Sequence, residues 1–202
     1  VGYQAAYNNT TGAGNVAIGD SALLNCTTGV NNTAIGYTAG RALTSGSQNT
    51  FIGPHVAGVG AAGYSMTTGS KNTILGGYNG NQGGLDIRTS NNNIVLSDGD
   101  GNPRLKIDST GVVHIPGSAV NPGTSGEVGL RFFPTGFIDS SISGQQCMNL
   151  NRESDSGQIV AFLQGGSLVG SISVTTSSTS FITSSDYRLK ENVDYTWDAT
   201  TR

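Results

Sequence analysis

Residues 29–36 decide the fold: they read GVNNTAIG, and closely related stretches occur at three other places in the 202-residue chain. These read GAGNVAIG at 12–19, GSQNTFIG at 46–53 and GSKNTILG at 69–76. The shared unit is Gly-x-x-Asn-x-apolar-apolar-Gly, and its first three copies follow one another at equal intervals. The last interval is longer; we place its six additional residues in 58–63 and expect weaker copies at 2–5 and 93–96. A repeat of nearly fixed period predicts stacked structural units.

Each repeat contains one short apolar strand, expected at 16–18, 33–35, 50–52 and 73–75, between turn residues. A single unit cannot bury its apolar face, whereas stacked units share one narrow core. The recurring glycines suit tight corners. The recurring asparagine either hydrogen-bonds the backbone at a corner or adopts the left-handed conformation itself. The repeats therefore predict an all-β fold that begins with a β-solenoid.

Composition agrees with this interpretation and excludes several classes of function. Glycine supplies 31 residues, and charged residues are only 11% of the chain, against about 25% in typical proteins. The 35% of apolar residues is little for a large single core. The net charge of −3 includes no basic patch, which argues against nucleic-acid binding. No apolar run is long enough to span a membrane as a helix.

The repeats over about residues 1–80 resemble the left-handed β-roll heads of trimeric autotransporter adhesins, and similar repeats occur in phage tail fibres. The resemblance implies a homotrimer, in which three chains pack side by side and bury the apolar edges of their rolls. A monomeric β-solenoid is the alternative. We assign the β-roll of 17-residue units to residues 1–84.

The rest of the chain is expected to form short strands with tight turns. A β-hairpin region at 85–117 contains strands at 93–97, 104–108 and 112–115, and residues 118–127 form a linker. A short-stranded, intertwined β-rich stem follows at 128–185, with strands at 128–133, 158–163 and 167–174. Residues 175–180 are a loop or an exposed strand. The sequence DGDGN at 98–102 lacks the later glutamate of an EF-hand and is interpreted as a turn.

Few residues suggest ligand chemistry. Cys26 and Cys147 lie far apart, without the spacing of a metal pair, and are expected to be buried apolar residues. His55 has no second ligand nearby in the sequence, so no metal and no cofactor are predicted. Exposed aromatic rings can stack on sugars, but Tyr37 directly follows a repeat core and is expected to be packed. The other tyrosines in or near the repeats are Tyr3, Tyr7, Tyr64 and Tyr78.

The composition changes sharply near the last residues, where the chain becomes highly charged. Residues 184–193 read SSDYRLKENV, and this run resembles the opening motif of the intramolecular chaperone domain of phage endosialidases and other tail spikes. The resemblance implies self-cleavage between Ser185 and Asp186, with Ser185 as the nucleophile and Lys190 as its base. A serine hydroxyl needs such a base, and a lysine can act as one when desolvation keeps it neutral.

Residues 186–202 are accordingly interpreted as the truncated start of this chaperone domain. The resemblance implies that the parent protein is a serine autopeptidase that acts on itself. Because the sequence continues only to Arg202 after Ser185, the catalytic surroundings are missing, and we expect neither efficient self-cleavage by this chain nor activity on another substrate. A membrane-bound transcription factor with the same module would need a basic DNA-binding region, which the repeats do not provide.

Together these features predict an extracellular virion component, a homotrimeric tail fibre or tail spike involved in host attachment. Its expected partners are two further copies of itself, other tail proteins and a host surface glycan or protein receptor, without nucleic acid or membrane insertion. The alternatives are a bacterial trimeric surface adhesin and the non-catalytic stem of a polysaccharide-degrading tail spike. A glycosidase needs a pair of carboxylates, and acidic residues are almost absent from the repeats.

Overall fold

The computed structural model describes residues 1–116, 129–142 and 145–183, and these residues are all-β with no helix. The chain divides into two compact units, Val1–Cys147 and Met148–Arg202, each of which is considered separately. The predicted all-β class is confirmed for the residues described. Among them, no helix is long and apolar enough to cross a membrane.

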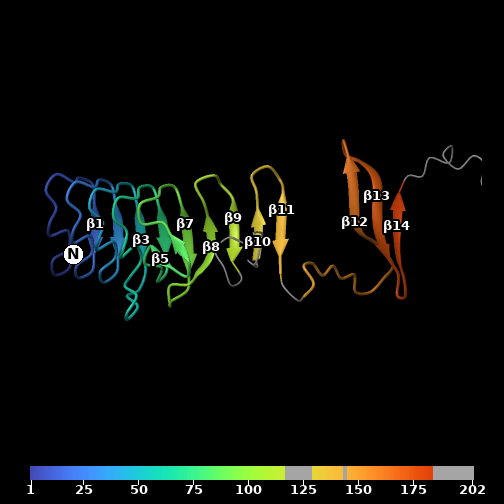
Figure 1. The fold of residues 1–202 in the computed structure, drawn as a ribbon, viewed down its shortest axis with the longest axis horizontal. Helices are drawn as coiled ribbons and strands as arrows, with labels where there is room; N and C mark the ends of the chain where they lie inside the picture. The colour runs from blue at the N-terminus through green and yellow to red at the C-terminus, as the bar shows by residue number, and fades with distance from the viewer. Residues whose placement is uncertain (117–128, 143–144, 184–202) are drawn as a thin grey trace, which may run out of the picture. The chain divides into compact units, whose positions relative to one another are not determined.

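The first unit is built on one nine-stranded sheet (Figure 1). Its strands are β1 (Val16–Ile18), β2 (Thr33–Ile35), β3 (Thr50–Ile52), β4 (Thr73–Leu75), β7 (Ile94–Ser97), β8 (Pro103–Ile107), β9 (Val113–Pro116), β10 (Gly129–Phe132) and β11 (Ile138–Ser141). The first five pair in parallel, and the remaining ones pair antiparallel. A small separate hairpin joins β5 (Asn81–Gln82) and β6 (Leu85–Asp86).

The parallel strands form a β-solenoid of about four turns. Equivalent residues of successive turns are 17, 17, 23 and 21 positions apart in the sequence. The strands nevertheless stay in register, from Val16 opposite Thr33 to Thr73 opposite Ile94. The predicted strands and the weaker copy at 93–96 are therefore confirmed. The longer third step contains a small hairpin closed between Val56 and Gly60, which begins before the predicted stretch 58–63.

A ladder of asparagine side chains runs through the solenoid, with one rung in each turn. At the central rung, the backbone N–H and the Nδ2 group of Asn49 both donate to Oδ1 of Asn32, each at 3.0 Å. The same Nδ2 donates to the carbonyl of Gly69 at 2.9 Å, and Oδ1 of Asn49 accepts the backbone N–H of Asn72 at 2.9 Å. The ladder consists of Asn15, Asn32, Asn49, Asn72 and Asn93.

The left-handed conformation belongs to the residue before each rung. Its φ is +56° at Asn31, +59° at Gln48 and +57° at Lys71. Of the two roles considered for the repeated asparagine, hydrogen bonding to the backbone is therefore the correct one. Each rung satisfies buried polar groups in two neighbouring turns, which would otherwise be costly to bury.

The repeated glycines allow successive turns to approach closely. A Cβ atom added to Gly29 would overlap the carbonyl oxygen of Gly46, and one added to Gly46 would overlap the carbonyl oxygen of Gly69. Gly36, at the other end of the unit, combines such an approach to Gly53 with a φ of +135°. Only glycine fits where the backbones of adjacent turns come this close.

The core of the first unit is narrow and lies inside the solenoid. Its largest fully buried apolar side chains are Tyr78, Phe51, Leu23, Leu43, Met66 and Ile74. Tyr78 donates its hydroxyl hydrogen to the carbonyl of Leu85 at 2.9 Å, which satisfies its one polar side-chain atom. Burial raises the pKa of Tyr78 well above its ordinary value, and the nearby Asp86 carboxylate adds to this shift.

The second unit is a three-stranded antiparallel sheet of β12 (Gly157–Gln164), β13 (Ser167–Val174) and β14 (Thr179–Thr183). The predicted strands at 158–163 and 167–174 are confirmed. The run 175–180 is a turn followed by the start of an exposed strand, so both alternatives are partly realised. Register shifts between β12 and β13 interrupt their pairing at two places.

We predict that Gly29→Ala destabilises the solenoid by about 1–3 kcal/mol, the usual cost of overpacking. Gly99→Ala is the matched control, because Gly99 also lacks a positive φ and an added Cβ there meets nothing within 4 Å. This control should be neutral or slightly stabilising. Thermal and denaturant unfolding of both variants measure the difference, and equal stabilities would contradict the close approach at Gly29.

We predict a larger loss for Asn49→Ala, because the substitution leaves the N–H of Asn72 and the carbonyl of Gly69 without this partner, while Oδ1 of Asn32 keeps only the backbone N–H of residue 49. Each unsatisfied buried group costs about 1–3 kcal/mol, so the expected loss is about 3 kcal/mol or more. Asn8→Ala serves as the control, since Asn8 also bonds an asparagine one turn away, Asn25, but is exposed. Its effect should stay within about 0.5 kcal/mol. A similar loss in both variants would show that the buried ladder carries no special stability.

Candidate self-association interface

Two columns of mostly apolar side chains cover the outer face of the nine-stranded sheet. In each three-residue strand the central residue points into the solenoid, and its two neighbours lie on the outer face. The first column contains Val16, Thr33, Thr50, Thr73, Ile94, Ile107, Val113, Phe132 and Ile138. The second contains Ile18, Ile35, Ile52, Leu75, Leu96, Leu105, Ile115 and Leu130. We call these columns together the outer apolar face.

The outer apolar face is substantially open to solvent in the single chain. Ile18 is 44% exposed in β1, and Phe132 in β10 is still 38% exposed. Scattered exposed apolar residues are ordinary, but a contiguous face of them marks an interaction surface. This face continues in register from β1 to β10, across both the parallel and the antiparallel parts of the sheet.

Beyond Val112 no apolar side chain is buried in 113–116, 129–142 or 145–183. The second unit shows this most clearly, because its sheet leaves large apolar residues open and Phe181 is 77% exposed. A two- or three-stranded sheet without a buried apolar face is at best marginally stable in water. This part of the chain therefore lacks a hydrophobic core of its own.

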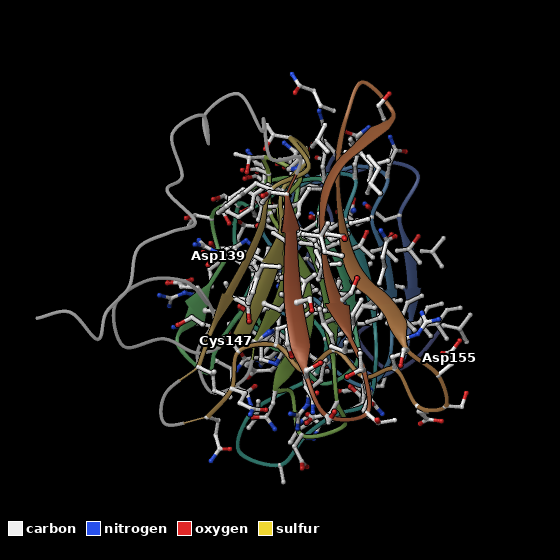
Figure 2. All side chains as sticks on the ribbon, turned by 90° about the vertical axis from the view of Figure 1, so that its right-hand side faces the viewer. Asp139, Cys147 and Asp155 are labelled. Carbon is white, nitrogen blue, oxygen red and sulfur yellow. The ribbon has the colours of Figure 1, made fainter. Side chains whose placement is uncertain are left out.

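The inner face of the sheet changes character where the solenoid ends. Val95 is the last buried apolar residue of the inner row, and the residues in register after it are Lys106, His114, Arg131 and Asp139. Figure 2 labels Asp139, which forms an ion pair with Arg131. The polar side of β8–β11 therefore faces inward, and the apolar side faces outward.

His114 is part of this inner row and is only 4% exposed. Its Nε2 lies 2.9 Å from Oδ2 of Asp108, whose carboxylate also accepts hydrogen bonds from Thr110. Burial opposes ionisation of Asp108, but these hydrogen bonds outweigh it and lower the pKa of the carboxyl to about 2. His114 thus lies on the inner face of β9, where Asp108 is its partner.

Other predictions from the sequence have mixed outcomes. Cys26 is buried as predicted, and burial raises the pKa of its thiol. The prediction for Cys147 was wrong, because this thiol follows β11 in an irregular segment and is exposed (Figure 2). The prediction that Tyr37 is packed in the repeat was also wrong, because its side chain is largely exposed. The turn at 98–102 is confirmed, since Asp98 accepts the backbone N–H of Asn102 at 2.9 Å.

The predicted catalytic pair Ser185 and Lys190, and the cleavage-site residue Asp186, lie outside the described residues. Within the described part of the chain, no three His, Cys, Asp or Glu side chains gather in a way that could hold a metal ion. No family model, curated protein or solved structure matches the chain. The outer apolar face is thus the candidate site that the described residues support best.

Proposed function

We propose that this chain is a structural subunit of a homotrimeric fibre, a virion tail fibre or tail spike that contributes to host attachment. The outer apolar face carries the proposal, since it is an extended interaction surface present in every copy of the chain. Two further copies are its proposed partners. Other tail proteins attach the trimer to the virion.

Self-association is favoured over a different partner by the distribution of apolar residues. The face extends over nearly the whole sheet, and an identical chain carries an apolar face of the same length that can cover it from end to end. Each square ångström of apolar surface removed from water contributes about 25 cal/mol. Three copies around one axis bury all three faces together and close the assembly. The exposed residues of β12–β14 gain a core in the same way.

The choice of a virion fibre over a bacterial adhesin rests on the sequence. The chain contains no heptads of a coiled-coil stalk, and residues 184–193 resemble the chaperone motif of phage tail spikes. In this proposal a C-terminal chaperone domain assists trimer assembly and is then released by cleavage after Ser185. A released assembly factor leaves the trimer kinetically stable, because unfolding is then not readily reversed. A bacterial trimeric adhesin, or the stem of a polysaccharide-degrading spike, is the alternative.

The full-length protein should have the mass of three chains by native mass spectrometry and light scattering. Leu75→Lys should prevent trimer formation, because each interface would then bury an unpaired ammonium group at a cost of several kcal/mol. Tyr7→Lys is the control, since Tyr7 is a large exposed side chain in a turn outside the sheet. A monomeric wild type, or a Leu75→Lys protein that still forms the normal trimer, would contradict the proposed interface.

Denaturing mass spectrometry of the full-length protein tests the proposed maturation. The wild type should yield a fragment that ends at Ser185, and Ser185→Ala should stay intact because its nucleophile is missing. Ser184→Ala keeps the nucleophile and should be cleaved like the wild type. If both the wild type and Ser185→Ala stay intact, the self-cleavage proposal fails, while the trimeric fibre is tested separately by its mass.

A further inference from the structure

The inserted hairpin of the third solenoid turn projects from the first unit (Figure 1). Val56 and Gly60 close this hairpin through two backbone hydrogen bonds of 2.7 and 2.8 Å. Asn79 of the next turn donates to the carbonyl of Val59 at 2.9 Å and holds the hairpin in place. A cleft at this hairpin has a volume of about 250 Å³ and is lined by His55, Gly58, Val59, Gly60 and Tyr64.

Two of the lining residues, His55 and Tyr64, contact a further aromatic or charged side chain. The rings of Tyr37 and His55 meet edge to face with their centres 4.9 Å apart, although Tyr37 is 51% exposed. Arg41 donates to the hydroxyl of Tyr64 at 3.2 Å, and its guanidinium lies 5.8 Å from the centre of that ring. The contacts hold these side chains in fixed positions, so little conformational entropy remains to be lost on binding.

The arrangement suits an uncharged ligand with many hydroxyl groups. The residues that line the cleft include no Asp, Glu, Lys or Arg, so the lining itself has no charge cluster to attract a polyanion. Flat aromatic faces offer apolar contact, while the imidazole, guanidinium and phenol groups supply directional hydrogen bonds. The cleft is somewhat smaller than the roughly 300–1,000 Å³ of drug-sized sites, as expected for one or two sugar rings.

We propose that this cleft binds a neutral glycan, with a sugar ring against Tyr37 or Tyr64 and its hydroxyls bonded to His55 and Arg41. The proposal rests on the function proposed above, because it names the class of receptor that the fibre contacts. The six additional residues of the third turn are then a recognition element, since the solenoid stacks equally well through its shorter steps between β1, β2 and β3.

The test is binding of the full-length trimer to an array of neutral oligosaccharides built from hexoses and N-acetylhexosamines. We expect binding of at least one of them and at least a tenfold weaker affinity for Tyr37→Ala and for His55→Ala. Phe137→Ala is the control, because Phe137 is similarly exposed but lies in the turn between β10 and β11. It should bind like the wild type.

A second variant tests the hairpin itself. Deletion of residues 55–60 restores the shorter repeat length and keeps the buried Ala61 and Ala62, so the solenoid should remain folded and trimeric while glycan binding is lost. An intact trimer that binds no neutral glycan, or binds only sugars that carry a carboxylate, would overturn the inferred site and leave the fibre proposal standing. Unchanged affinity in the Tyr37→Ala and deletion variants would also overturn it, whereas a monomeric wild type would contradict the fibre proposal.

Discussion

The whole first unit depends on the close contact between the backbones of successive turns. Glycine at each corner permits this contact, and the asparagine ladder satisfies the polar groups that the contact buries. Such tight stacking leaves only a narrow interior, which receives one central side chain from each strand, such as Ala34 of β2 or Phe51 of β3. The two flanking residues of each strand, such as Ile35, are placed on the outer face. The exposure of apolar side chains on that face is therefore a direct result of how the turns stack.

The inner face of the sheet changes at β8. There a row of charged and polar residues, from Lys106 to Asp139, follows Val95 in register and replaces the apolar row of the solenoid. The outer face keeps its apolar character through β9 and β10 without interruption. The outer apolar face is thus continuous across the parallel strands of the solenoid and the antiparallel strands that follow them. The exposed apolar residues of the second unit follow the same principle, since that sheet also has no core in a single chain.

Much of the backbone arrangement could be predicted from the sequence, because repeats and turns are local signals. The strands at 16–18, 33–35 and 50–52 were located to the residue. The strand at 138–141 was not foreseen, since its sequence IDSS is polar and is ordered by pairing with β10. Burial was harder to predict than strand position. In a segment such as Thr33-Ala34-Ile35, apolarity alone suggests that isoleucine lies inside, whereas the strand places Ala34 inside, in register with the large Phe51 of the next turn. The exposure of Tyr37 and Cys147 likewise depends on tertiary packing.

The corner loops of the solenoid differ in length, although its strands pair in the same way throughout. Strand register is the same whether equivalent residues are 17, 23 or 21 positions apart, so the length of a corner loop has no influence on how the strands align. Loops at these corners can therefore be exchanged, lengthened or removed while the strands of the solenoid keep their register. A single insertion can thus add new surface without disturbing the strands, and the same corners offer positions at which foreign peptides can be displayed on a rigid support.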